Sequence, residues 1–301
     1  MDLTKFDYNL ERDVKEHEAL YKNRAIYSLP ARVGDWNEKL SREEQTLNTF
    51  QEKRARRELL IDKTKAMFET LLRPVPLSKN LPFVEFGKCF QLKALAIPSN
   101  GEFGVYLNVS ADVDVKILQR GGDLTASPEK APCVRNVFVL RGSDKDRDGE
   151  CVYYGQDVFV QPYSSDPSAP LYVHCENVTA DTLGDHLTPE LNPNAGFYAR
   201  FKVLHWNPKL RESTIGSCFA PGERVIIQHA ASGMNLAVEC NKRVPTLFGL
   251  EFSVTCHTFK DTRRVETGEN VWKIVQHTGI DKSALVRATK GEEISMELLE
   301  G

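Results

Sequence analysis

A glycine followed by a strand-like run of residues occurs three times at nearly constant spacing, and this repeat restricts the fold more than any other feature of the chain. The three glycines are Gly87, Gly155 and Gly222, which lie 68 and 67 residues apart. Glycine adopts backbone angles that other residues avoid, so each copy is expected to begin with a tight turn. The repeat predicts one domain built from three similar units.

Two further strand patterns follow in each copy. A second short strand comes after a turn-rich stretch, at 105–109, 171–173 and 235–238. A later strand places a large aromatic residue two positions before a branched aliphatic one, so both side chains point to the same face. These pairs are Phe138 with Leu140, Phe201 with Val203, and Trp272 with Ile274. Each unit therefore has one apolar face that it cannot bury alone.

The third copy has His229 at the end of its first strand and closes on the sequence Asn270-Val271-Trp272-Lys273-Ile274. This layout resembles the MIR-type trefoil repeat, in which such residues form core and turns first. Closing three units around one axis buries their apolar faces and removes exposed strand edges. We expect a mainly β fold, a β-trefoil-like (MIR-type) domain over 80–280 with repeats at about 84–150, 151–217 and 218–280. A β-sandwich is the alternative, but it gives no reason for three copies.

The chain before this domain has a helical pattern. Residues 35–72 include no glycine or proline, and apolar residues such as Leu40, Leu47 and Phe50 recur at helical spacing among mixed charges. We expect a long charged amphipathic helix over 35–73, an irregular arm over 1–34 that Pro30 and Gly34 interrupt, and a tail over 281–301. Such a helix is too long to bury on one small domain, so a partner is expected along it; packing on its own domain is the alternative.

Composition argues against two classes of partner. The net charge is −3 and the sequence pI is about 6.2, so no basic field favours nucleic acid or an anionic membrane. The charged N-terminus does not resemble a signal peptide, and the longest apolar runs are only strand-sized. The seven cysteines form no CxxC pair, as is typical of a reducing compartment. We expect a soluble intracellular protein that binds neither nucleic acid nor membrane.

Motifs for catalysis or for a bound cofactor are not found. No GxSxG, GxxxxGK[ST] or GxGxxG sequence occurs. His174 and Cys175 are neighbours on a strand and point to opposite sides, which argues against zinc there. Asp144, Asp146 and Asp148 match the first half of a calcium loop, but Gly155 stands where a bidentate glutamate is needed. The sequence leaves open whether these three residues bind a cation. We predict no enzyme and no catalytic, cofactor or metal residue.

Several segments together resemble one protein family. They begin with Gly34-Asp35-Trp36-Asn37-Glu38, Phe50-Gln51-Glu52-Lys53-Arg54 and Leu72-Arg73-Pro74 in the helical region. They continue with Tyr154-Gly155-Gln156-Asp157, Phe248-Gly249, His257-Thr258, Arg264-Val265-Glu266 and Glu269-Asn270-x-Trp272 in the β region. In this order they resemble the family of cilia- and flagella-associated protein 161.

This resemblance implies a structural, non-catalytic component of the ciliary or flagellar axoneme. Members of the family look like microtubule inner proteins, bound to the luminal wall of the doublet A-tubule, with α/β-tubulin and neighbouring inner proteins as partners. On that basis we assign Trp36, Arg54, Arg56 and Arg57 as candidate tubulin or partner contacts. The alternative function is an intracellular MIR-like trefoil module that binds a sugar or peptide ligand.

Overall fold

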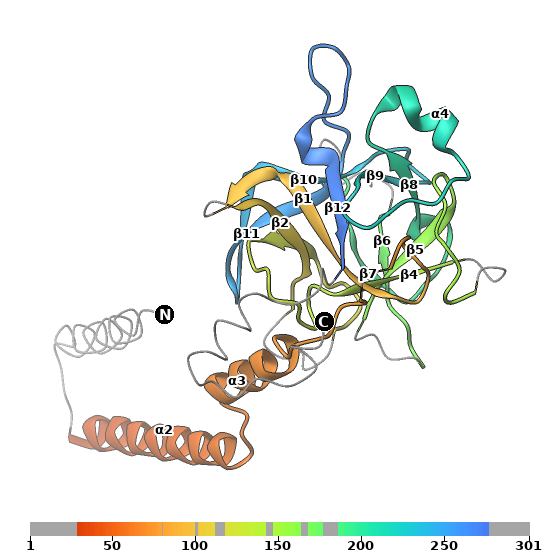
Figure 1. Ribbon diagram of the computed structural model, residues 1–301. Coiled ribbons are helices and arrows are strands. Elements are labelled where there is room, and N and C mark those ends of the chain that lie inside the picture. The colour runs from red at the N-terminus through yellow and green to blue at the C-terminus, as the bar shows by residue number, and fades with distance from the viewer. Residues whose placement is uncertain are drawn as a thin grey trace, which may run out of the picture. The chain divides into compact units, whose positions relative to one another are not determined.

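The computed structural model describes residues 29–79, 81–99, 102–111, 118–142, 147–163, 168–176 and 186–276 (Figure 1). The chain divides between Asp62 and Lys63 into two compact units. The first unit contains helix α2, and the second contains most of helix α3 and all the strands. Of the helices in these ranges, none has the length and apolar character that crossing a membrane requires.

Helix α2, Leu29–Ala55, begins earlier than the sequence predicts. Residues 29–34, which we expected to be irregular, form its first turns. Pro30 is the second residue of the helix, where a missing N–H is harmless because the first helical N–H groups have no partner within the helix. Gly34 lies inside the helix and does not interrupt it. The remainder of the expected arm, residues 1–28, lies outside the described residues, as does the expected tail.

The prediction of one continuous helix over 35–73 is wrong, because α2 ends at Ala55 and α3 spans Leu60–Leu71. Arg57 adopts the left-handed conformation with φ 56°. The N–H of Glu58 donates to the carbonyl of Lys53 at 2.8 Å, and the N–H of Arg57 donates to that of Arg54 at 3.2 Å. This pair of hydrogen bonds is a Schellman cap, which normally has glycine at the left-handed position. With arginine there, the sequence pattern gives no sign of the break.

Twelve strands make up the β structure of the described residues. Their bounds are β1 Cys89–Ser99, β2 Glu102–Val109, β3 Leu124–Ser127, β4 Phe138–Arg141, β5 Asp157–Pro162, β6 Tyr172–His174, β7 Glu190–Asn192, β8 Arg200–His205, β9 Arg224–His229, β10 Leu236–Thr246, β11 Gly249–Cys256 and β12 Val271–Val275. Ten of them form one sheet in the order β10-β11-β3-β2-β1-β12-β9-β8-β5-β4, and β6 pairs with β7 in a second sheet. Because β4 also pairs with β1, the six strands from β1 to β4 in this order close into a barrel. β1 and β12 run side by side in it (Figure 1). A mainly β fold with a closed barrel and an N-terminal helix is thus confirmed.

The three repeat glycines have the same conformation and the same type of partner. Gly87, Gly155 and Gly222 adopt φ values of 77°, 81° and 83°. Their N–H groups donate to carbonyls in β4, β8 and β12: Leu140 at 3.0 Å, Val203 at 2.9 Å and Ile274 at 2.8 Å. These bonds therefore join the turns before β1, β5 and β9 to β4, β8 and β12, respectively. The expected tight turns at these glycines are confirmed.

Equivalent aromatic residues fill the barrel core. Phe138, Phe201 and Trp272 are fully buried, one from each of β4, β8 and β12. The Trp272 indole N–H donates to the carbonyl of Leu236 at 2.8 Å, so its polar edge is satisfied in the core. Asn270, also fully buried, accepts from the N–H of Phe259 and donates to the carbonyl of His257. The expected core and turn roles of Asn270 and Trp272 are confirmed.

Candidate partner-binding surface

Helix α2 presents a stripe of large apolar side chains to solvent. Trp36, Leu40, Leu47 and Phe50 are 62%, 41%, 59% and 49% exposed. Their spacing of four, seven and three residues keeps all four within a narrow arc of the helix surface, because an α-helix turns about 100° per residue. We call these four residues the α2 stripe. Exposed apolar side chains gathered on one face are typical of an interaction surface.

The predicted contact residues do not form one compact site. Arg54 lies 18 positions after Trp36, a whole number of helical turns, so it extends the stripe at its C-terminal end about 27 Å away. Arg56 and Arg57 belong to the turn after α2, and all three arginines are exposed. The structure thus gathers Arg54, Arg56 and Arg57 at one end of the helix and leaves Trp36 near the other end.

Electrostatics favour a basic C-terminal end of α2. Lys53 and Arg54 occupy its last turn, where the carbonyl groups without helical partners carry partial negative charge. Glu43 lies in the same arc as the α2 stripe and interrupts its apolar character. A partner for this face would therefore have an apolar groove, a cationic or hydrogen-bond-donating group opposite Glu43, and acidic groups near Arg54.

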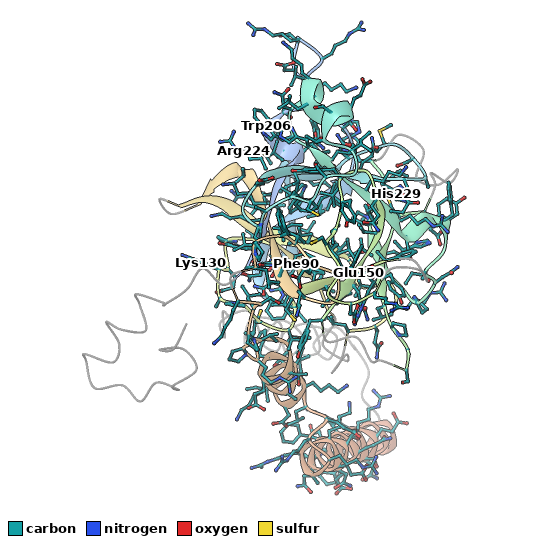
Figure 2. The ribbon with its side chains drawn as sticks, turned by 45° about the vertical axis from the view of Figure 1, so that its right-hand side comes forward. Phe90, Lys130, Glu150, Trp206, Arg224 and His229 are labelled. Atoms are coloured by element: carbon teal, nitrogen blue, oxygen red, sulfur yellow. The ribbon has the colours of Figure 1, made fainter. Side chains whose placement is uncertain are left out.

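Exposed apolar residues also occur on the barrel unit, where the sequence pattern does not predict them. Trp206 and Ile215 are 41% and 62% exposed and flank the short helix α4, Arg211–Thr214. The guanidinium of Arg224 lies 5.5 Å from the centre of the Trp206 ring, a cation–π contact, and Figure 2 labels both residues on the same side of the barrel. The segment around α4 has no periodic apolar pattern. Trp206 is therefore the sequence signal that could have identified it.

The candidate calcium loop is only partly described. Asp144 and Asp146 lie outside the described residues. Asp148 forms an ion pair with Arg141, and both side chains are substantially exposed. Arg141 also donates from Nε to the side-chain oxygen of Gln161 at 2.9 Å. In the described part of this loop, the Asp148 carboxylate is therefore used for holding β4 to the following turn.

A polar cluster of titratable groups lies beside β10 and β11. Nδ1 of His186 is 2.6 Å from Oε1 of Glu239, and the ring of His257 stacks on His186 at 3.7 Å between centres. Burial, the largest influence, acts to raise the pKa of Glu239, but hydrogen bonds from His186 and Thr255 outweigh it, and the pKa is lowered. Burial, followed by the charge of His186, lowers the pKa of His257. These contacts hold Glu239 of β10 against His186 and Thr255, with the His257 ring stacked on His186.

Fold and surface together define a closed β-barrel protein with a helical extension that presents an apolar face to solvent. The family model described as the cilia- and flagella-associated protein 161-like domain matches residues 63–185 and 182–277. The chain belongs to this family.

Individual relatives agree with this assignment. Cilia- and flagella-associated protein 161 of Danio rerio is 27% identical over 266 residues, covering 82% of this chain and 86% of its own length. The mouse protein of the same name is 27% identical over 291 residues, covering 86% of this chain and 90% of its own length.

Among solved structures, the SDF2-like protein from Arabidopsis thaliana is 14% identical, with a TM-score of 0.47 over 64% of this chain and 94% of its own.

Proposed function

We propose that the protein is a structural, non-catalytic component of the ciliary or flagellar axoneme, a microtubule inner protein on the luminal wall of the doublet A-tubule. The names of its relatives supply the association with cilia and flagella. The observation that carries the binding mode is the exposed α2 stripe, which Arg54 follows on the same side of the helix. α/β-tubulin and neighbouring inner proteins are the proposed partners.

The dimensions of α2 suit a filamentous partner. Its 27 residues extend about 40 Å, the length scale of a globular subunit in a polymer. The four side chains of the stripe are 41–62% exposed, so covering what remains contributes roughly 1 kcal/mol each before the cost of association. Repetition along a lattice multiplies such modest contacts through effective concentration. The compact barrel would occupy space between protofilaments.

We further propose that the barrel domain is a β-trefoil. Each of the three units supplies two strands to the six-stranded barrel, its first and its last. The remaining strands of each unit pair with each other, as β2 with β3, β6 with β7, and β10 with β11. The equivalent glycine turns support the same assignment. A closed unit of this kind has few free edges, which suits a protein packed among many neighbours.

A paired set of variants in a ciliated cell tests the role of the α2 stripe. The variant Leu47→Glu with Phe50→Glu places two charges in the stripe. The variant Gln45→Glu with Thr49→Glu adds the same two charges to the opposite face of α2 and serves as the matched control. We expect the stripe variant to lose its association with isolated axonemes while the control remains bound.

The same comparison separates the alternative function. If both variants bind axonemes as the unmodified protein does, the stripe is not the contact surface. If the unmodified protein is absent from axonemes and binds a sugar or peptide through the barrel loops, the MIR-like ligand-binding function takes its place.

A further inference from the structure

β6 and β7 form a small two-stranded sheet, and Leu191 of β7 also exchanges backbone hydrogen bonds with Gly121 and Gly122 before β3. The sheet pairs only three residues, with His174 opposite Glu190 and Val173 opposite Leu191. Two-stranded ribbons of this length are marginally stable in water. Val173 and Leu191 face the core and are buried, so the other face of the ribbon carries His174 and Glu190. The contacts of His174 and Glu190 on this second face are therefore separate from the core packing of Val173 and Leu191.

Three potential metal ligands meet on that face. One ring nitrogen of His174 and one carboxylate oxygen each of Glu176 and Glu190 all lie within 4.8 Å of one another. The strand register explains part of the meeting, because Glu190 is the cross-strand partner of His174. Glu176 follows His174 by two residues, just beyond the end of β6. Donors about 2.1 Å from a tetrahedral ion are about 3.4 Å apart, so small side-chain rotations would bring these three to ligand distance.

A second, independent observation points to a ligand. His174 is only 4% exposed, and its Nδ1 is buried without a hydrogen-bond partner. Burying an unpaired ring nitrogen costs free energy that water would otherwise offset. Two carboxylates lie beside this ring, and no lysine or arginine side chain within the described ranges forms an ion pair with either of them. The group combines negative charge with an unsatisfied imidazole.

We propose that His174, Glu176 and Glu190 bind a divalent transition-metal ion, with Zn²⁺ as the best match. Imidazole nitrogen with carboxylate oxygen is a ligand set that Zn²⁺ accepts at tetrahedral geometry, and water would take the fourth position. The ion would neutralise the two carboxylates and join β6 to β7. The sequence predicts that His174 and Cys175 point to opposite sides of a strand, and Cys175 is buried in the core. The cross-strand partner Glu190 could be recognised only from the register.

The test uses the full chain, stripped of metal with a chelator and kept reduced so that its seven cysteines stay free. Calorimetric titration with ZnCl₂ should show one equivalent bound per chain and a rise in the unfolding temperature. Glu190→Gln and Glu176→Gln should each weaken binding by more than the ~10-fold that loss of an outer-shell partner costs. Glu176 is exposed, so its variant should fold normally even if changes at the hairpin register do not.

Two further measurements guard against binding elsewhere. His257→Gln alters the stacked histidine cluster instead and should leave the affinity unchanged. Co²⁺ in place of Zn²⁺ should give a visible spectrum without thiolate charge-transfer bands, because no cysteine belongs to the proposed ligand set. The proposal is overturned if Zn²⁺ does not bind, if Glu176→Gln and Glu190→Gln bind it as the unmodified chain does, or if thiolate bands dominate the spectrum.

Discussion

Arg135 and Glu251 form a buried ion pair that joins the turn before β4 to β11. Nη2 of Arg135 donates to both carboxylate oxygens of Glu251 at 2.8 Å, and each side chain is 3% exposed. The hydroxyl of Thr125 also donates to Glu251, at 2.6 Å. The ring of Phe248 covers the guanidinium at 3.7 Å and packs edge-on against Phe68 of α3. The pair thereby links α3 to the barrel through a continuous set of contacts.

Replacing Arg135 with methionine should lower the free energy of unfolding by about 3–5 kcal/mol, because it leaves the Glu251 carboxylate buried without its counter-charge. Urea denaturation followed by tryptophan fluorescence measures this. Asp148→Asn breaks the exposed pair with Arg141 and is the control, with an expected loss below about 1 kcal/mol. Equal losses in the two variants would show that the buried Arg135–Glu251 pair contributes no more to the free energy of unfolding than the exposed pair does. The double variant Arg135→Met with Glu251→Leu should recover part of the loss.

Arg57→Gly should stabilise the end of α2. Arginine in the left-handed region is strained by roughly 1 kcal/mol relative to glycine, and the cap hydrogen bonds do not involve its side chain. We expect a peptide spanning 29–62 to show higher helical content by circular dichroism after this change. Arg56→Gly, one residue earlier, is the comparison and should lower it, since glycine is the poorer residue before the cap. A decrease for Arg57→Gly would contradict the cap geometry.

The repeat glycines allow backbone strain and steric contact to be separated. At Gly222 an added Cβ meets no atom within 4 Å, so Gly222→Ala should cost only the left-handed backbone term, about 1–2 kcal/mol. At Gly87 the same atom would lie 2.6 Å from Cγ of Asp148, so Gly87→Ala should cost more. Thermal unfolding of the two variants measures the difference. If Gly222→Ala is the more damaging, the steric account is wrong.

Stability should fall as the pH drops below about 6.5. His229 is fully buried; its Nε2–H donates to the Tyr198 carbonyl at 2.9 Å, and Nδ1 accepts from Ser232 at 2.8 Å. Burial lowers its pKa from 6.5, so the unfolded chain binds a proton that the folded one excludes. This contribution is constant above pH 6.5 and is lost progressively below it, down to the folded-state pKa.

Urea denaturation at a series of pH values between 7.5 and 5.5 checks this. The slope for one histidine is at most about 1.4 kcal/mol per pH unit. His257, whose pKa is also lowered, should contribute in the same direction. His229→Gln keeps a hydrogen-bond donor without a titrating group and should show a shallower dependence. A dependence that is unchanged in this variant would assign the effect to other groups.

Local patterns explain how much of this fold the sequence predicts. Gly87, Gly155 and Gly222 indicate the turns before β1, β5 and β9, because a glycine turn and an alternating strand lie next to each other in the chain. The aromatic residues of β4, β8 and β12 reveal the core for the same reason. Arg135 and Glu251 are 116 residues apart, so no window of sequence indicates that they meet.

The apolar stripe of α2 follows from the sequence pattern. Leu40, Leu47 and Phe50 were recognised as an apolar stripe from their helical spacing, and the structure leaves them exposed. The break at Arg57 was missed because an arginine occupies a position that glycine usually marks. The meeting of His174 with Glu190 was missed because it depends on the β6–β7 register, which strand propensity alone does not determine.

Extraction of isolated cilia shows whether the protein lies inside the doublet microtubule. The tagged full-length protein is followed through detergent treatment, a high-salt wash and then disruption of the doublet wall. We expect the protein to stay with the doublets through the salt wash and to be released only when the wall opens. Release with the detergent-soluble fraction, or absence from cilia, would contradict an inner position on the microtubule.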